Sequence, residues 1–188
     1  MRVLLTGFGP FGDVASNPSE RLARHFAPRV VTLALPTSFA RAARGMREAL
    51  GADEFDVVLM LGVAESAQAV HVETQGRNRD EARIADVDGA QRRGPIVDGG
   101  PEVLPVTIDV ARVQGALASA GLAARLSGSA GAYVCNHLLY ATLFHLRETS
   151  TRAGFLHLPA DRHTHAPPRC ERAFDEHVAA VEAALSAL

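Results

Sequence analysis

SGSAGAYVCNHLLY, residues Ser127 to Tyr140, joins a run of small residues to a cysteine and then to an apolar stretch with helical spacing. This pattern predicts a helix that begins close to Cys135. The unpaired backbone N–H groups at a helix start favour an anion, so a cysteine there is stabilised as the thiolate, and the same groups can hold an oxyanion. The alternative is a small side chain buried where the helix packs on a core, because free cysteines are commonly buried.

The composition indicates one globular domain that spans residues 1–188. The chain is 47% hydrophobic, which is enough for one sizeable core, and its formal net charge is -2. This charge gives no reason to expect nucleic acid or an anionic membrane as a partner. No apolar run approaches the roughly 20 residues of a membrane span, so we expect no membrane association.

The complete absence of lysine narrows the chemistry. It excludes a Walker lysine, a Schiff base and a Ser–Lys dyad, which leaves cysteine, histidine and the carboxylates; we expect no cofactor and no metal. Residues Met1 to Thr6 lack the pattern of a signal peptide, so we expect a cytoplasmic location. In that reducing compartment Cys135 and Cys170 are expected to be free thiols.

The first third of the chain alternates apolar strands with helices. This βαβαβ order predicts an α/β sheet with helices on both faces. The expected strands are Arg2–Thr6, Arg29–Leu35 and Asp56–Val63, and the expected helix caps are Asn17 and Thr37. In the helix expected at 37–50, Phe39 belongs to the apolar residues at helical spacing.

GFGPFG, residues Gly7 to Gly12, matches the glycine pattern of a dinucleotide-binding turn. Pro10 removes a backbone donor from that turn, however, and the next helix begins only after Asn17, which argues against a nucleotide site. We interpret the stretch as a glycine-hinged surface loop that carries Phe8 and Phe11, two aromatics that suit a flat apolar ligand. The alternative for at least one of them is packing on the core.

Two polar side chains stand near the ends of predicted strands. Gln68 to Thr74 alternates in character and places Glu73 where a strand ends; a solvated edge position is the alternative explanation. Gly154 to Leu158 predicts a short strand that presents His157 near its end, where the active-site residues of open α/β sheets gather. With Cys135 these residues form a candidate Cys–His–acid triad, although spacing alone does not place them together.

The remaining segments complete the predicted order. Gly76 to Gly100 is irregular and rich in arginine, which indicates either an arm that packs on another subunit or a loop that covers a site. A strand at 103–108, a helix at 109–120 with Asp109 as its expected cap and a closing helix at 171–188 follow. A metal-dependent hydrolase that uses His157, His163 and His165 is a weaker alternative, because the last two lie in a loop without a carboxylate at ligand spacing.

Several motifs occur together in the order typical of one family. They are TGFGPFG with NPSE at 6–20, LP at 35–36, Glu73 through Asn78 to the ARIAD of 82–86, LPV at 104–106, SAGAYVCNHLLY at 129–140 and AGFLHLP at 153–159. On these motifs the chain resembles, over nearly its whole length, the pyrrolidone-carboxylate peptidases (pyroglutamyl peptidase I), a cytosolic family of cysteine peptidases.

The resemblance implies roles for individual residues. Cys135 would be the nucleophile, His157 its base and Glu73 the acid that orients the imidazole. Arg83 would help to hold the oxyanion beside the Cys135 N–H. Phe8, Phe11 and Tyr133 match positions that surround the lactam ring of the substrate, and Asn17 matches a loop asparagine close to it.

The resemblance also implies a fold and a reaction. The fold would be a single-domain three-layer α/β/α sandwich with a twisted, mixed, mainly parallel sheet, assembled as a homo-oligomer, either a tetramer or a dimer. The substrates would be peptides with an N-terminal pyroglutamate, cleaved through a thioester acyl-enzyme. A catalytically impaired binding domain of the same fold and another small cysteine hydrolase are the alternatives. The chain departs from the family pattern at Thr74, at Ser66-Ala67 and in a shortened region after Pro159.

Overall fold

A computed structural model describes residues 1–188. Its centre is a six-stranded sheet with the order β2-β1-β3-β10-β4-β9. The strands are β1 (Val3–Phe8), β2 (Val31–Leu35), β3 (Val57–Ala64), β4 (Val70–Glu73), β9 (Ala124–Ser127) and β10 (Arg152–Pro159). All neighbouring strands are parallel except β10 and β4, which are antiparallel. The prediction of a mixed, mainly parallel sheet is confirmed.

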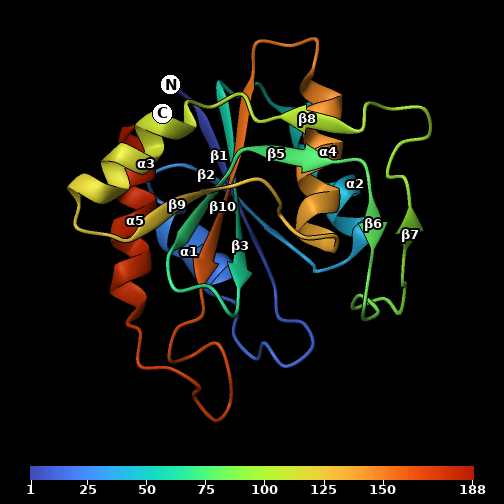
Figure 1. The fold of residues 1–188 in the computed structure, drawn as a ribbon. Helices are drawn as coiled ribbons and strands as arrows, with labels where there is room; N and C mark the ends of the chain where they lie inside the picture. The colour runs from blue at the N-terminus through green and yellow to red at the C-terminus, as the bar shows by residue number, and fades with distance from the viewer.

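Helices cover both faces of this sheet, as Figure 1 shows. The helices are α1 (Pro18–Phe26), α2 (Phe39–Ala52), α3 (Val110–Ser119), α4 (Val134–Leu146) and α5 (Phe174–Ser186). Helices α1, α3 and α5 pack on one face, and α2 and α4 pack on the other. The predicted three-layer α/β/α arrangement is therefore correct. None of the helices combines the length and the apolar character that a membrane crossing needs.

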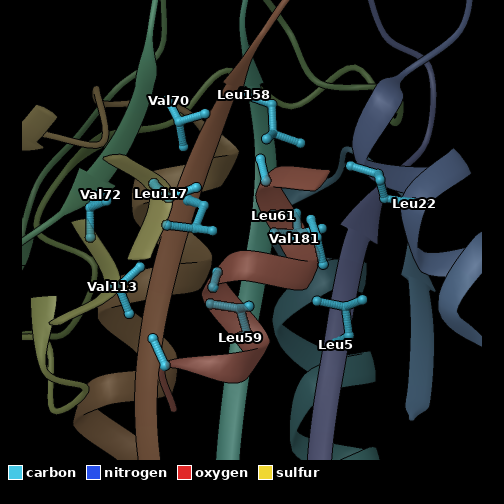
Figure 2. Packing of buried hydrophobic residues seen from close by; sticks show 14 of the residues in the cluster. Leu5, Leu22, Leu59, Leu61, Val70, Val72, Val113, Leu117, Leu158 and Val181 are labelled. Atoms are coloured by element: carbon cyan, nitrogen blue, oxygen red, sulfur yellow. The ribbon is translucent and has the colours of Figure 1, made fainter. Parts of the chain in front are cut away.

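The two helical layers create two hydrophobic cores, because the central strands are apolar on both faces. In β3, Leu59 and Leu61 face α1, α3 and α5, whereas Val58 and Met60 face α2 and α4. Figure 2 shows the first of these cores, where Leu61 lies close to Val181 of α5. A side chain's position along a strand therefore decides which layer it meets.

Short polar side chains cap three of the helices. Asn17 and Asp109 each accept a hydrogen bond from a backbone N–H in the first turn of the helix that follows, as predicted for these N-cap residues. The predicted cap Thr37 is wrong: Ser38 caps α2, and the Thr37 hydroxyl donates instead to the buried carbonyl of Gly9 at 2.9 Å. Thr37 and Ser38 fit the N-cap pattern equally well, and the contact of Thr37 with Gly9 leaves Ser38 as the cap.

The segment predicted to be irregular contains two small antiparallel ribbons. β5 (Gln75–Arg77) pairs with β8 (Val103–Pro105), and β6 (Asp80–Glu81) pairs with β7 (Arg93–Gly94). Figure 1 shows this green segment beside α4. The predicted strand at 103–108 is thus shorter than expected, β2 begins two residues later than predicted, and the closing helix begins at Phe174 rather than at 171.

The loop that was predicted to carry two aromatics carries one. Phe8 is the last residue of β1 and is buried in the core beneath α2 and α4, so its assignment to a surface loop is wrong. The chain at Gly7 approaches α1 so closely that a Cβ on this residue would lie 2.0 Å from the carbonyl oxygen of Ser19. Only glycine permits this backbone contact between the strand and the helix.

We expect Gly7→Ala to lower the free energy of unfolding by about 1–3 kcal/mol, because an added methyl group would meet rigid backbone rather than a movable side chain. Gly51→Ala is the matched control: this glycine lies in α2 with open space around its Cα. The control should leave stability unchanged or raise it by up to about 1 kcal/mol. Urea unfolding measures both variants, and equal stabilities for the two would contradict the close contact.

Candidate active site

Helix α4 places Cys135 in its first turn, as the sequence predicts. No side chain caps this helix, and its first backbone hydrogen bond is donated by the N–H of His137 to the carbonyl of Tyr133, at 3.1 Å. The N–H of Cys135 precedes that bond and is left available for an anion. Cys135 is also partly exposed rather than sealed in the core, which argues against a purely structural thiol.

The register of β10 and β4 brings Glu73 to His157. Phe155 pairs with Glu73 and His157 pairs with His71, so Glu73 and His157 are diagonal neighbours on one face of the sheet. The Nδ1 atom of His157 lies 2.8 Å from Oε1 of Glu73. Glu73 has no solvent exposure, because β4 lies between β10 and β9; the alternative of a solvated edge residue is wrong.

Gly62 of β3 brings the thiol to the imidazole. In the parallel pairing of β3 and β10, Gly62 lies directly beside His157. A Cβ on this glycine would be 3.1 Å from the Cys135 Sγ atom and 3.1 Å from the His157 Cδ2 atom. The thiol and the imidazole therefore both lie against Gly62, in the space that a side chain would fill. The structure thus brings all three residues of the candidate triad together.

The electrostatics of this cluster favour a charged imidazole. Burial opposes the positive charge, but interactions with the Cys135 side chain and with the Glu73 carboxylate outweigh it and raise the pKa of His157 to about 9. His157 is thus an imidazolium at neutral pH. A cationic imidazole beside a cysteine is the arrangement that favours a reactive thiolate.

Aromatic side chains lie next to this cluster at the start of α4. The Tyr133 ring centroid is 6.0 Å from that of Phe11 and 5.4 Å from that of Phe39. The Tyr133 hydroxyl donates to the carbonyl of Ala85 at 3.0 Å. Burial and the negative charges of neighbouring groups raise the pKa of Tyr133 to about 12, so it remains a neutral phenol. Phe39 was predicted only as a core residue of α2.

Asn17 braces the loop after β1 rather than lying open to solvent. It is 1% exposed, its Nδ2 donates to the carbonyl of Gly9 at 3.1 Å, and its Oδ1 accepts from the backbone N–H of Ser19 at 3.1 Å. Because Thr37 donates to the same Gly9 carbonyl, two buried side chains fix the beginning of this loop. Phe11 is thereby presented from an anchored backbone.

Arg83 lies on the exposed side of a hollow of about 880 Å³ that is also lined by Tyr133. The hollow lies beside the cluster and is not lined by Cys135 or His157. Arg83 forms no hydrogen bond with Cys135. The structure thus places Arg83 in a hollow that it shares with Tyr133, two residues before Cys135, and not in contact with the thiol.

The histidines of the metal-hydrolase alternative are engaged separately or exposed. His165 Nε2 lies 2.6 Å from Glu65 Oε2, His157 is bonded to Glu73, and His163 is exposed. No group of three histidine, cysteine or carboxylate side chains is arranged to hold a metal ion. Nothing in this geometry therefore supports the alternative.

Comparison with known proteins gives the family. Residues 1–188 match the sequence model of the family described as pyroglutamyl peptidase. The chain belongs to this family. Similar proteins named pyrrolidone-carboxylate peptidase include one from Gloeobacter violaceus, 39% identical over 85% of this chain and 82% of the relative. Another, from Streptomyces coelicolor, is 40% identical over 84% of this chain and 77% of the relative.

Solved structures of pyroglutamyl peptidases share the fold. The pyroglutamyl peptidase I of Bacillus amyloliquefaciens matches with a TM-score of 0.91 and 28% identity, covering 99% of this chain and 93% of that one. The pyrrolidone carboxyl peptidase of Fervidobacterium islandicum matches with a TM-score of 0.93 and 28% identity, covering 98% and 96%. The resemblance seen in the sequence motifs is confirmed, and the chain is a hydrolase of the pyroglutamyl peptidase I type.

Sequence reasoning assigned no role to Asn136, which follows Cys135 in this pyroglutamyl peptidase. Its Oδ1 accepts from the backbone N–H of Arg77 at 2.9 Å, and its Nδ2 donates to the carbonyls of Arg77 and Arg79 at 2.9 and 3.0 Å. The side chain thus acts as an extra strand partner that ties residues 77–79 to the first turn of α4. The one sequence feature that could have pointed to Asn136 is its position directly after Cys135 in the motif at 129–140.

Asp80 was also missed, because nothing in the sequence distinguishes it from the other acidic residues of this arginine-rich segment. It is 1% exposed, and one carboxylate oxygen lies 2.9 Å from His137 Nδ1 and 2.8 Å from Arg92 Nε. Asp80 therefore fixes β6 against the second residue after Cys135. Together with Asn136 it anchors the two ribbons on the helix that carries the thiol.

We expect Glu73→Gln to lower kcat by about 10- to 10⁴-fold with the fold intact, since an amide holds the ring but stabilises its cation less.

The carboxylate helps to raise the pKa of His157, so the imidazolium should persist up to about pH 9 and the alkaline fall of kcat/KM should lie there. Removing the negative charge should shift that fall to lower pH. A variant with an unchanged rate and pH profile would show that another acid, or none, orients His157.

Proposed function

We propose that Cys135, His157 and Glu73 are the catalytic residues of this pyroglutamyl peptidase. The observation that carries the proposal is the buried hydrogen bond from the imidazole to Glu73, at 2.8 Å, with the thiol beside the same imidazole at an uncapped helix start. These are the nucleophile, the base and the orienting acid that acyl transfer requires.

In the first half of the reaction, the Cys135 thiolate attacks the carbonyl carbon of the pyroglutamyl residue. The C–S bond forms, and the carbonyl oxygen becomes an oxyanion. When this intermediate collapses, the C–N bond to the rest of the peptide breaks. The imidazolium of His157 gives its Nε2 proton to the leaving amine, which departs as a neutral amino terminus. The product is a thioester between Cys135 and the pyroglutamyl group.

In the second half, neutral His157 accepts a proton from water, which attacks the thioester carbonyl. The C–S bond breaks, free pyroglutamate leaves, and the thiolate and imidazolium are restored. Glu73 keeps Nδ1 hydrogen-bonded throughout and stabilises the cation each time it forms. The pair therefore returns to its starting protonation state without any added cofactor.

We further propose that the backbone N–H of Cys135 stabilises the oxyanion, because it stands free in the first turn of α4. Arg83 is proposed as a second donor. Its side chain is exposed and takes part in no ion pair, and it lines the same hollow as Tyr133. It would have to extend toward the thiol when the substrate binds.

The lactam ring is proposed to bind in a slot against the aromatic pair Phe11 and Tyr133, and buried Phe8 belongs to the core cluster on which Tyr133 packs. Asn17 contributes through the loop that it braces at Gly9. The ring nitrogen of pyroglutamate is an uncharged amide, so no carboxylate is needed to receive an amino terminus. An apolar slot with a few hydrogen-bonding groups is sufficient for recognition.

The same family membership leads us to propose the wider setting of the enzyme. Residues 1–188 would act as one domain, because one six-stranded sheet draws its strands from both halves of the chain. A cytoplasmic location is supported by two free thiols. A homo-oligomer, either a tetramer or a dimer, is supported by large apolar side chains left in solvent, such as Leu126 on the edge strand β9 and Val103 on β8. Light scattering in solution measures the number of chains.

Cys135→Ala should abolish hydrolysis of pyroglutamyl-aminomethylcoumarin, because no other group at this place can form the thioester. Cys170→Ala is the matched control: its thiol donates to the carbonyl of Ala160 at 3.4 Å, outside the triad, so activity should remain. A dead Cys170 variant would refute the assignment. No hydrolysis by the unmodified protein would instead favour an impaired binding domain.

The slot should discriminate strongly against proline, which would bury a charged amine and leave hydrogen-bonding groups unpaired. We expect kcat/KM for prolyl-aminomethylcoumarin to be roughly 10³-fold or more below that for the pyroglutamyl substrate. Phe11→Ala should cost about 1–3 kcal/mol of transition-state binding through the lost apolar contact. Comparable kcat/KM values for the two substrates in the unmodified protein would contradict the proposed slot.

A further inference from the structure

The hollow beside Tyr133 is unusually rich in arginine. Four of its lining residues are arginines, contributed by the ribbon segments and the loop between them: Arg77, Arg79, Arg83 and Arg93. Its one acidic lining residue is Glu81. The volume, about 880 Å³, falls within the range of ligand sites.

The positive charge of this hollow is largely uncompensated. Arg79 forms an ion pair with Glu81, Nη2 to Oε2 at 3.0 Å, which uses the only carboxylate present. Arg77, Arg83 and Arg93 take part in no ion pair. Three exposed guanidinium groups without carboxylate partners line one hollow, and together they give it a positive potential that favours a negatively charged ligand.

The hollow is physically joined to the proposed catalytic cluster. Tyr133, the N-cap residue of α4, lines the hollow and stands two positions before Cys135. The side chain of Asn136 holds the backbone of Arg77 and Arg79 from the other side of the cysteine. The positive end of the α4 dipole adds to the same potential. Tyr133 and Asn136, on either side of Cys135 in the chain, therefore connect the arginine-lined hollow to the start of α4.

We propose that this hollow receives the part of the peptide that follows the pyroglutamyl residue, and that it selects carboxylate side chains there. The inference rests on the proposed function, since it takes the lactam ring to occupy the slot against Phe11 and Tyr133. With the ring in that slot, the leaving portion has to pass out beside Tyr133. Guanidinium groups bind carboxylates in bidentate fashion, so acidic residues at the first positions after the scissile bond are the chemistry that fits.

The test compares two amidated peptides, pyroglutamyl-Glu-Glu-amide and pyroglutamyl-Gln-Gln-amide, which differ only in side-chain charge. We expect kcat/KM to be about 5- to 10-fold higher for the acidic peptide at about 0.01 M ionic strength. The ratio should fall below about 2-fold near 1 M, where the Debye length shrinks to roughly 3 Å. A ratio close to one at low ionic strength would overturn the proposal.

Substitutions locate the effect. The double variant R77Q/R93Q removes two unpaired guanidinium groups outside the catalytic cluster, and it should lose the preference while still hydrolysing the neutral peptide. R93Q alone, at the exposed end of β7, should lower the ratio at least about twofold. The control R112Q removes an exposed arginine of α3, on the opposite face of the sheet, and should keep the full ratio. A preference that survives in R77Q/R93Q would refute the assignment to these residues.

A binding measurement separates this proposal from the catalytic one. Cys135→Ala, which cannot turn over substrate, should bind a fluorescent acidic pyroglutamyl peptide at least about 5-fold more tightly than its glutamine counterpart at low ionic strength. If the unmodified protein fails to hydrolyse any pyroglutamyl substrate, the proposed function fails, and this difference in Kd still decides the role of the hollow. Equal Kd values would overturn it.

Discussion

A carboxylate with no exposure to solvent must find a partner, and Glu73 has one, the imidazole of His157 on the neighbouring strand. The partnership depends on β4 running antiparallel to β10, in the register that makes the two residues diagonal neighbours. Side chains alternate between the faces of a strand, so a slip of one residue would send Glu73 into the apolar core beneath α3 and α5. The buried pair therefore penalises any other register at the centre of the sheet.

The rest of the proposed catalytic cluster is assembled on that fixed pair. β3 adds Gly62 next to His157, and α4 delivers Cys135 across it. The ribbons then attach to α4 through Asn136 and Asp80. The arginine-lined hollow is therefore connected to the strand pair that holds the imidazole through the ribbons, α4 and Gly62.

Much of this could be predicted from local sequence signals. Asn17 and Asp109 cap helices by contacts within one turn, and Cys135 stands at a helix start that its own neighbours define. The failures involve partners distant in the chain. The burial of Glu73 could not be predicted without knowing that β9 pairs with the outer side of β4. Thr37 does not cap its helix because its hydroxyl bonds to Gly9, which is distant in the chain.

The two ribbons were missed for a related reason. Their strands are only two or three residues long, which is too short for alternation to be visible, and their order comes largely from side chains such as Asp80 that hold them to α4. The family motifs supplied what spacing could not, namely that Cys135, Glu73 and His157 belong to one constellation. Phe39, by contrast, matched a core pattern so well that nothing in the sequence marked it as a neighbour of Tyr133.

The contact between the thiol and the imidazole depends on the absence of a Cβ atom at Gly62. The sulfur and the ring share the room that a single methyl group would fill, and Phe155 closes the remaining side, 2.9 Å from the same point. A relative could thus keep its cysteine, histidine and glutamate, carry alanine here, and hold the thiol away from the imidazole. With the catalytic roles proposed above, the search for active members among diverged sequences has to check four positions, and the fourth of them carries no side chain.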